Sequence, residues 1–212
     1  MNKKLLVVFI MTILSTAIFI SGCATNMQVA PQTRQAIHSI NIDNNIPKPK
    51  EIYYMSSLGI ASMGFGVIGA LTVGETHDVK QKDELMNIIK ANNIDIGQIV
   101  SQQFTRQLQQ NGINVVNGGN SDATLHINID NYGLSARSQF SGSMLGPILI
   151  FDVELDKDGV VVWKTKNITT TITSDMPRHN LAEIEQNPQV LVQMWDAAAA
   201  KMVANALVRY NH

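Results

Sequence analysis

The chain has 212 residues, of which 45% are apolar and only 16% are charged, with a formal net charge of −1 and one cysteine. A typical globular domain is about a quarter charged, so this chain is poor in charge. The near-neutral balance argues against a general nucleic-acid-binding protein, which would carry a basic excess. One cysteine excludes an intramolecular disulfide and a zinc cluster built on cysteines. The length suits one domain with short attachments.

The first segment has the parts of an export signal. Lys3 and Lys4 give it a positive start, residues 5–20 are mostly apolar and uncharged, and two small residues precede Cys23. This order predicts a signal peptide over residues 1–22. The alternative is an amino-terminal transmembrane anchor with an incidental cysteine. Removal of the signal leaves 14 basic and 17 acidic residues, a net charge of −3.

Residues 20–23, Ile-Ser-Gly-Cys, resemble the lipobox of bacterial lipoproteins. The resemblance implies that the thiol of Cys23 receives a diacylglycerol and that the mature chain begins there. Several acyl chains anchor a protein firmly, because each buried methylene contributes about 0.8 kcal/mol. Ala24 rather than aspartate follows the cysteine, which in this family implies the outer membrane, with the protein facing the periplasm. The polar residues 23–36 are then predicted to be a lipidated tether.

Two short extended segments come next. Isoleucines at 37, 40 and 42 predict a first strand, which ends at a polar stretch containing Pro47 and Pro49. Residues 52–55 predict a second extended piece.

Residues 52–74 are a glycine-rich apolar excursion. The 23 residues between Glu51 and Glu75 carry no charge, a length that in principle crosses a bilayer as a helix. Small residues recur at every fourth position and would form one stripe on a helix, where they let two backbones approach closely. This stripe consists of Ser62, Gly66, Ala70 and Gly74. Three interpretations stay open: burial on the domain's own core, packing against another protein chain, and insertion into a membrane.

The remaining sequence predicts two main helices. Residues 75–92 indicate only a helical turn or two. Asp95 as the amino-terminal cap, apolar residues at four-residue spacing and Gly112 as the stop predict a helix between them. Asn187 and Pro188 begin the last helix.

Strands separate the two helices. A brief strand is predicted at 113–116, and alternation of apolar and polar residues predicts strands over 123–130 and 148–155. Residues 133–147 are predicted to be a loop or an irregular hairpin end. The turn at 156–159 leads into a returning strand that continues to 173. We therefore expect one α+β domain over residues 37–212, with a mixed, mainly antiparallel sheet packed by two main helices.

No set of residues indicates catalysis. The five histidines have no zinc-binding spacing. Asp152, Glu154 and Asp156 share one face of a predicted strand, a pattern typical of a solvated sheet face. Ser141 lacks the context of a nucleophile elbow. The G-x-G-x-x-G match at 64–69 lies in an apolar run. We expect no enzymatic activity, cofactor, metal or small-molecule substrate.

The order of elements resembles the small α/β domain of periplasmic lipoproteins related to the TolB amino-terminal domain and the curli-secretion lipoprotein. The resembling segments are 98–112 with 113–116, then 123–130, and 155–159 leading into Val162 and Trp163. Together with Cys23, this predicts a non-enzymatic lipoprotein that binds a protein partner in an envelope assembly or transport system. The alternative is a membrane-inserting or oligomerising subunit of a secretion-type complex that uses residues 52–74.

Overall fold

The structure is a computed structural model that describes residues 26–64, 74–138, 140–169 and 175–211. Within 61–64, 74–77 and 166–169 it describes the backbone alone. The predicted signal peptide, Cys23, Gly66 and Ala70 therefore lie outside the described residues.

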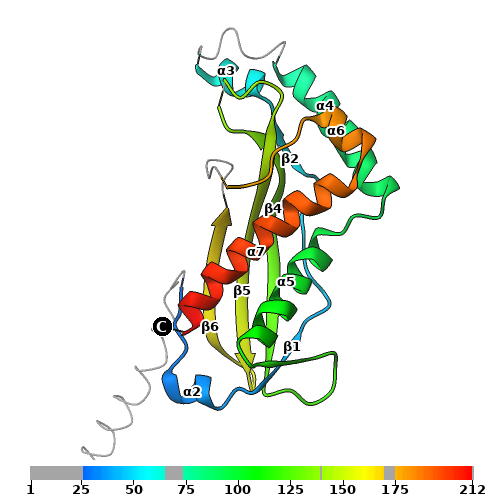
Figure 1. The fold of residues 1–212 in the computed structure, drawn as a ribbon. Coiled ribbons are helices and arrows are strands. Elements are labelled where there is room, and N and C mark those ends of the chain that lie inside the picture. Colours follow the sequence, from blue (N-terminus) through cyan, green and yellow to red (C-terminus); the bar gives the residue numbers. More distant parts are fainter. Residues whose placement is uncertain (1–25, 65–73, 139, 170–174, 212) are drawn as a thin grey trace, which may run out of the picture.

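One mixed sheet runs the length of the molecule (Figure 1). Its strands are Ser39–Ile42 (β1), Tyr53–Met55 (β2), Asn114–Val116 (β3), Ala123–Ala136 (β4), Leu145–Lys157 (β5) and Val160–Thr169 (β6). The order across the sheet is β3-β1-β4-β5-β6, and β2 pairs with the far end of β4. Pairs that involve β1, β2 or β3 are parallel and short, whereas β4, β5 and β6 form long antiparallel ladders. The mixed, mainly antiparallel sheet confirms the predicted α+β class.

Two main helices pack against this sheet, as predicted (Figure 1). The helices are Pro31–Gln35 (α2), Ser57–Gly64 (α3), Gly74–Ala91 (α4), Ile96–Gln110 (α5), Leu181–Gln186 (α6) and Gln189–Asn211 (α7). α5 and α7 are the two main ones. The Asp95 carboxylate accepts hydrogen bonds from the amides of Gly97 and Gln98, at 2.7 and 3.3 Å, which confirms the predicted cap of α5. α4 is longer than the one or two turns predicted. Its sequence is polar and shows little amphipathic periodicity, so the sequence alone indicates a helix only weakly.

Aromatic pairs join the two main helices to the sheet. Each is an edge-to-face contact, a geometry that adds to the burial of the rings. Phe104 of α5 meets Phe151 of β5 with the ring centroids 5.8 Å apart. α7 makes the other two contacts, Trp195 with Tyr132 of β4 at 5.6 Å and Tyr210 with Trp163 of β6 at 5.3 Å. These contacts fix both helices on the same sheet.

The hairpin of β4 and β5 is longer than the sequence predicted. The loop or irregular hairpin end expected over 133–147 is shorter, since β4 continues to Ala136 and β5 begins at Leu145. The pairing register shifts at a bulge between Ile129 and Asn131. Before the bulge the buried positions are odd-numbered, and after it residues 132–136 are all buried. A bulge inserts one residue and shifts the alternation of buried and exposed positions. The period-two pattern therefore stops at the bulge, although the strand continues beyond it.

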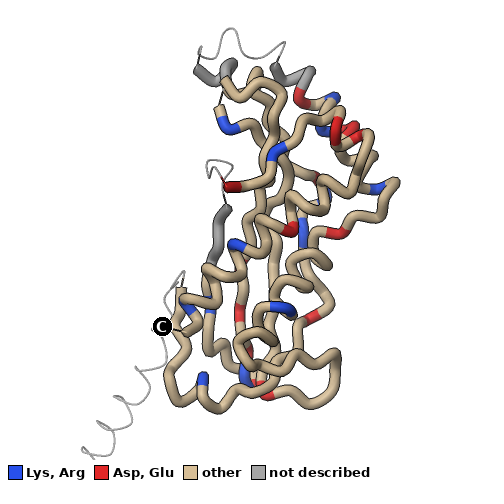
Figure 2. The backbone as a smooth tube through the Cα atoms, in the orientation of Figure 1, with Lys and Arg blue, Asp and Glu red and all other residues tan. Residues whose placement is uncertain are grey.

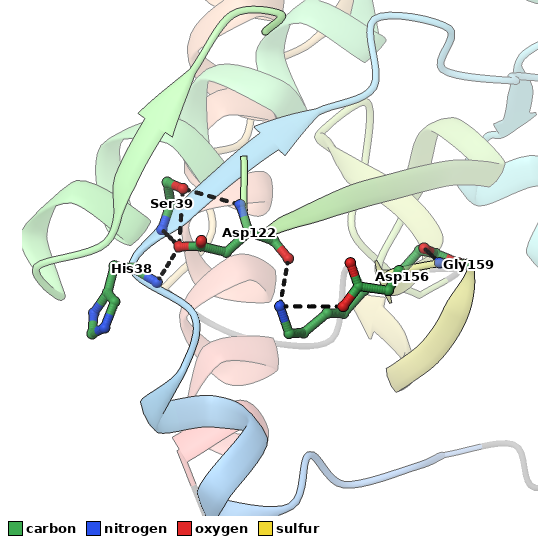
Figure 3. Close-up of polar contacts among 7 residues, drawn as sticks. His38, Ser39, Asp122, Asp156 and Gly159 are labelled. Atoms are coloured by element: carbon green, nitrogen blue, oxygen red, sulfur yellow. Dashed lines mark hydrogen bonds and ion pairs between the residues drawn. The ribbon is translucent and has the colours of Figure 1, made fainter. Parts of the chain in front are cut away.

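A carboxylate ties the strands together at the other end of the sheet (Figure 3). Asp122, just before β4, accepts hydrogen bonds from the amides of His38 and Ser39, both at 2.8 Å, and from the Ser39 hydroxyl at 3.0 Å. Lys157, at the end of β5, donates to the carbonyl of Asp122 at 3.2 Å. The start of β1 is thereby joined to the hairpin of β5 and β6.

Candidate functional site

The predicted packing stripe spans described and undescribed residues. Ser62 lies in α3 and Gly74 begins α4, where the structure gives the backbone, and the two residues between them in the stripe lie outside the described part. None of the four side chains is described, so the packing stripe stays a prediction. Across the described residues, no helix is both long enough and apolar enough to cross a membrane.

The start of α3 is held by two polar side chains. The hydroxyl of Ser56 caps the helix by accepting a hydrogen bond from the amide of Gly59 at 3.1 Å. Asp78 of α4 accepts a hydrogen bond from the amide of Ser56 at 3.3 Å. A Cβ atom on residue 59 would lie 2.3 Å from the Asp78 carboxylate, so the glycine gives this side chain its space. One glycine of the apolar excursion is thus explained by a contact between α3 and α4.

β2 and α4 are also joined through a half-buried phenol. The Tyr54 hydroxyl donates to the side-chain oxygen of Gln81 at 2.5 Å. Burial raises the pKa of Tyr54, with a further contribution from the nearby Asp78 carboxylate. The phenol therefore stays protonated and keeps its role as donor.

The loop between β4 and β5 packs beside α3. The Ser57 hydroxyl donates to the carbonyl of Gly142 at 2.5 Å. Within the loop, Ser141 accepts a hydrogen bond from the amide of Ser138 at 2.9 Å, and Ser138 accepts one from the amide of Phe140 at 3.2 Å. These bonds give the loop a defined turn, and Phe140 lies on its outer side.

Three apolar side chains of α3 and this loop face solvent. Phe140 is 87% exposed, Leu58 46% and Met144 37%. We call these three residues the distal apolar patch. Full burial of such a side chain typically contributes about 1.5–3 kcal/mol. Burial of Phe140 against a partner would therefore stabilise the complex.

α3, which carries Leu58, lies at one end of the molecule, and the first described residues run along the edge of β6 to α2 at the other end (Figure 1). Met27 forms a β-bridge with Lys164 of β6, and Lys164 lies across the sheet from His126 of β4. Met55, at the end of β2, pairs with Ser135 of β4. These two positions of β4 are nine residues apart in sequence, which corresponds to about 30 Å at about 3.3 Å per residue. Charged residues lie along α4 and α6, whereas the described part of α3 carries none (Figure 2).

A second candidate is a groove of about 480 Å³ on the polar face of the sheet. His126 lies 3.0 Å from Asp43, and Lys164 forms an ion pair with Glu154. The backbone amide of Asn45, followed by His126, lowers the pKa of Asp43. The described residues that line the groove carry no hydroxyl or thiol that the imidazole–carboxylate pair could activate. Its chemistry is that of a solvated, ion-paired surface.

Phe140 is not among the site residues expected from the sequence. It lies among serine and glycine residues in the segment that was expected to be a loop, and an aromatic residue there is a signal that could have been used. Leu58 and Met144 carry no comparable signal, because only the fold brings α3 beside this loop.

No protein family matches the chain, and no curated protein does either. Among solved structures, it resembles protein XCC0632 from Xanthomonas campestris, assigned to family DUF330, with 12% sequence identity and a TM-score of 0.43. The similarity covers 88% of this chain and 93% of that chain. A likeness of this degree carries no statement about what this chain does.

Proposed function

We propose that the protein is a non-enzymatic lipoprotein, anchored in the outer membrane through Cys23, that binds a protein partner in an envelope assembly or transport system. The anchor rests on the lipobox-like residues 20–23. The observation that supports partner binding is the distal apolar patch, in which a hydrogen-bonded loop and α3 expose three large apolar side chains.

The position of the patch favours a protein as its partner. Phe140 and its neighbours lie about 30 Å along the sheet from the end at which the chain enters the domain. This separation favours a surface other than the bilayer that would hold Cys23. A protein with an apolar pocket for an aromatic side chain fits the patch, since buried aromatic anchors dominate many interfaces.

Crosslinking in cells tests this proposal. A photoreactive amino acid placed at Phe140 in the full-length chain should capture one protein, and the same amino acid at Val160 should not. Val160 is the matched control, because it is 61% exposed and lies in the hairpin at the other end. Phe140→Ser together with Leu58→Ser should reduce the complex recovered through an affinity tag by at least about tenfold, the loss of roughly one anchor side chain.

Other products of the crosslinking would decide against a separate protein partner. An adduct to a second copy of the chain would support an oligomerising subunit, and an adduct to phospholipid would support membrane insertion. Equal capture from both positions would show that the patch is not a specific interface.

A further inference from the structure

The first described residues extend the sheet beyond its last strand. Met27 makes two backbone hydrogen bonds to Lys164 on the outer edge of β6, at 2.7 and 3.1 Å. Beside it, Asn26 accepts a hydrogen bond from the hydroxyl of Thr165 at 3.0 Å. Thr165 is only 1% exposed and also accepts a hydrogen bond from Arg209 of α7 at 3.1 Å. The entry point of the chain is thus held by both the sheet and a main helix.

The following residues continue this attachment. Val29 is buried in the hydrophobic core. Arg34 of α2 donates to the carbonyl of Tyr210 at 3.2 Å and to that of Asn211. These carbonyls belong to the last turn of α7, where a helix has no further amides to pair with them and where a positive charge is favourable. Residues 26–37 therefore belong to the folded domain.

We propose that residues 26–37 form a rigid mount, which holds the domain at a fixed height and orientation above the membrane. The inference deepens the proposed function and rests on a lipid at Cys23. Three residues from Cys23 to Asn26 span at most about 10 Å, whereas a free tether over residues 23–36 would reach about 20 Å on average. The edge of β6 at Lys164 then lies near the bilayer, and the distal apolar patch lies about 30 Å further along the sheet.

The mount can be tested on the full-length lipidated protein in vesicles of phosphatidylethanolamine and phosphatidylglycerol. Cys23 is the only cysteine and its thiol would be acylated, so a donor dye attached to Val79→Cys labels one site. Val79 is exposed, lies in α4 near the distal end and is outside the patch. Time-resolved energy transfer to acceptors on the lipid headgroups then measures how far this site stays from the membrane.

The parent protein should show weak transfer with a narrow distribution of distances. Met27→Pro with Arg34→Ala removes an amide of the sheet edge and the contact with α7, so transfer should become stronger and broader. Met27→Ala keeps the amide and should behave like the parent. A parent distribution as broad as that of a variant with twelve glycine and serine residues inserted after Ala24 would overturn the mount.

Two further readouts separate failure of the mount from failure of the anchor. Incorporation of labelled palmitate, lost in Cys23→Ala, tests the anchor alone. Hydrogen exchange tests the mount alone: the Met27 amide should exchange at least about tenfold more slowly than in an unstructured peptide. Exchange of Met27 at the unstructured rate overturns the mount, whatever the palmitate result is.

Discussion

Asp122 shows how one side chain can join distant parts of this chain. Its carboxylate accepts hydrogen bonds from two backbone amides and one hydroxyl at the start of β1, more than 80 residues earlier in the sequence. The backbone amides of His38 and Ser39, followed by the Ser39 hydroxyl, hold the pKa of Asp122 below its ordinary value of 3.8. Protonation of this carboxyl therefore weakens the link between β1 and β4.

We predict that the free energy of unfolding decreases as the pH falls. An aspartate with a lowered pKa in the folded state contributes stability that is fully present above the unfolded pKa and is lost as the pH falls through the folded pKa. Asp122→Asn keeps an acceptor oxygen but removes the titration, so stability should depend less on pH below about 4. Urea unfolding at a series of pH values measures this dependence.

Asp158→Asn is the matched control for this measurement. Asp158 lies in the turn between β5 and β6, and its side chain is 84% exposed. The control should keep the pH dependence of the parent protein. If Asp122→Asn also keeps it, the carboxylate of Asp122 does not contribute in the way the hydrogen bonds indicate.

The contact between β2 and β4 depends on a glycine. A Cβ atom on residue 133 would lie 1.8 Å from the carbonyl oxygen of Tyr53, so no side chain fits where β2 approaches β4. The carbonyl of Gly133 also accepts a hydrogen bond from the indole of Trp195 at 3.1 Å. This one position therefore joins β2, β4 and α7.

Gly133→Ala should destabilise the protein by at least about 3 kcal/mol, because β2 must move away from β4. Urea unfolding followed by tryptophan fluorescence measures the loss. Gly118→Ala is the control: residue 118 has open space around it and a φ of +74°, so only backbone strain of roughly 1 kcal/mol is expected. Equal losses in the two variants would show that the approach of β2 contributes nothing.

The elements differ in how well their sequences predict them. α5 was predicted from its Asp95 cap and its four-residue apolar repeat, since both are local features. For α4 the sequence predicts only one or two turns. Contacts with other elements, such as that between Gln81 and Tyr54, hold this polar helix, and they leave no local pattern in the sequence. The far half of β4 was missed because of the bulge before Asn131.

The whole molecule has two functional ends in the proposed arrangement. The end with Met27, α2 and the end of α7 receives the chain from the membrane, and α3 with the β4–β5 loop carries the distal apolar patch (Figure 1). The length of the β4–β5 hairpin sets the distance between these two groups of residues, because they lie toward opposite ends of the hairpin.

The mount should also contribute to stability when no membrane is present. A chain that begins at Ile37 lacks the buried Val29 and the contact of Arg34 with α7. We expect it to unfold at a free energy about 2 kcal/mol lower than a chain that begins at Ala24, roughly the value of one buried aliphatic side chain. Denaturant unfolding of the two chains gives the difference. Identical stability would mean that residues 24–36 only rest on the surface.

The sequence by itself determined the class of fold, the cap of α5 and the hairpin turn between β5 and β6, because each depends on residues close together in the chain. It also carries the prediction of a lipid anchor at Cys23. Only the tertiary structure decided that residues 26–37 dock on β6 and α7 and that the β4–β5 loop lies beside α3. Those arrangements join segments that are tens to more than a hundred residues apart, and local periodicity has no information about which distant surfaces will meet.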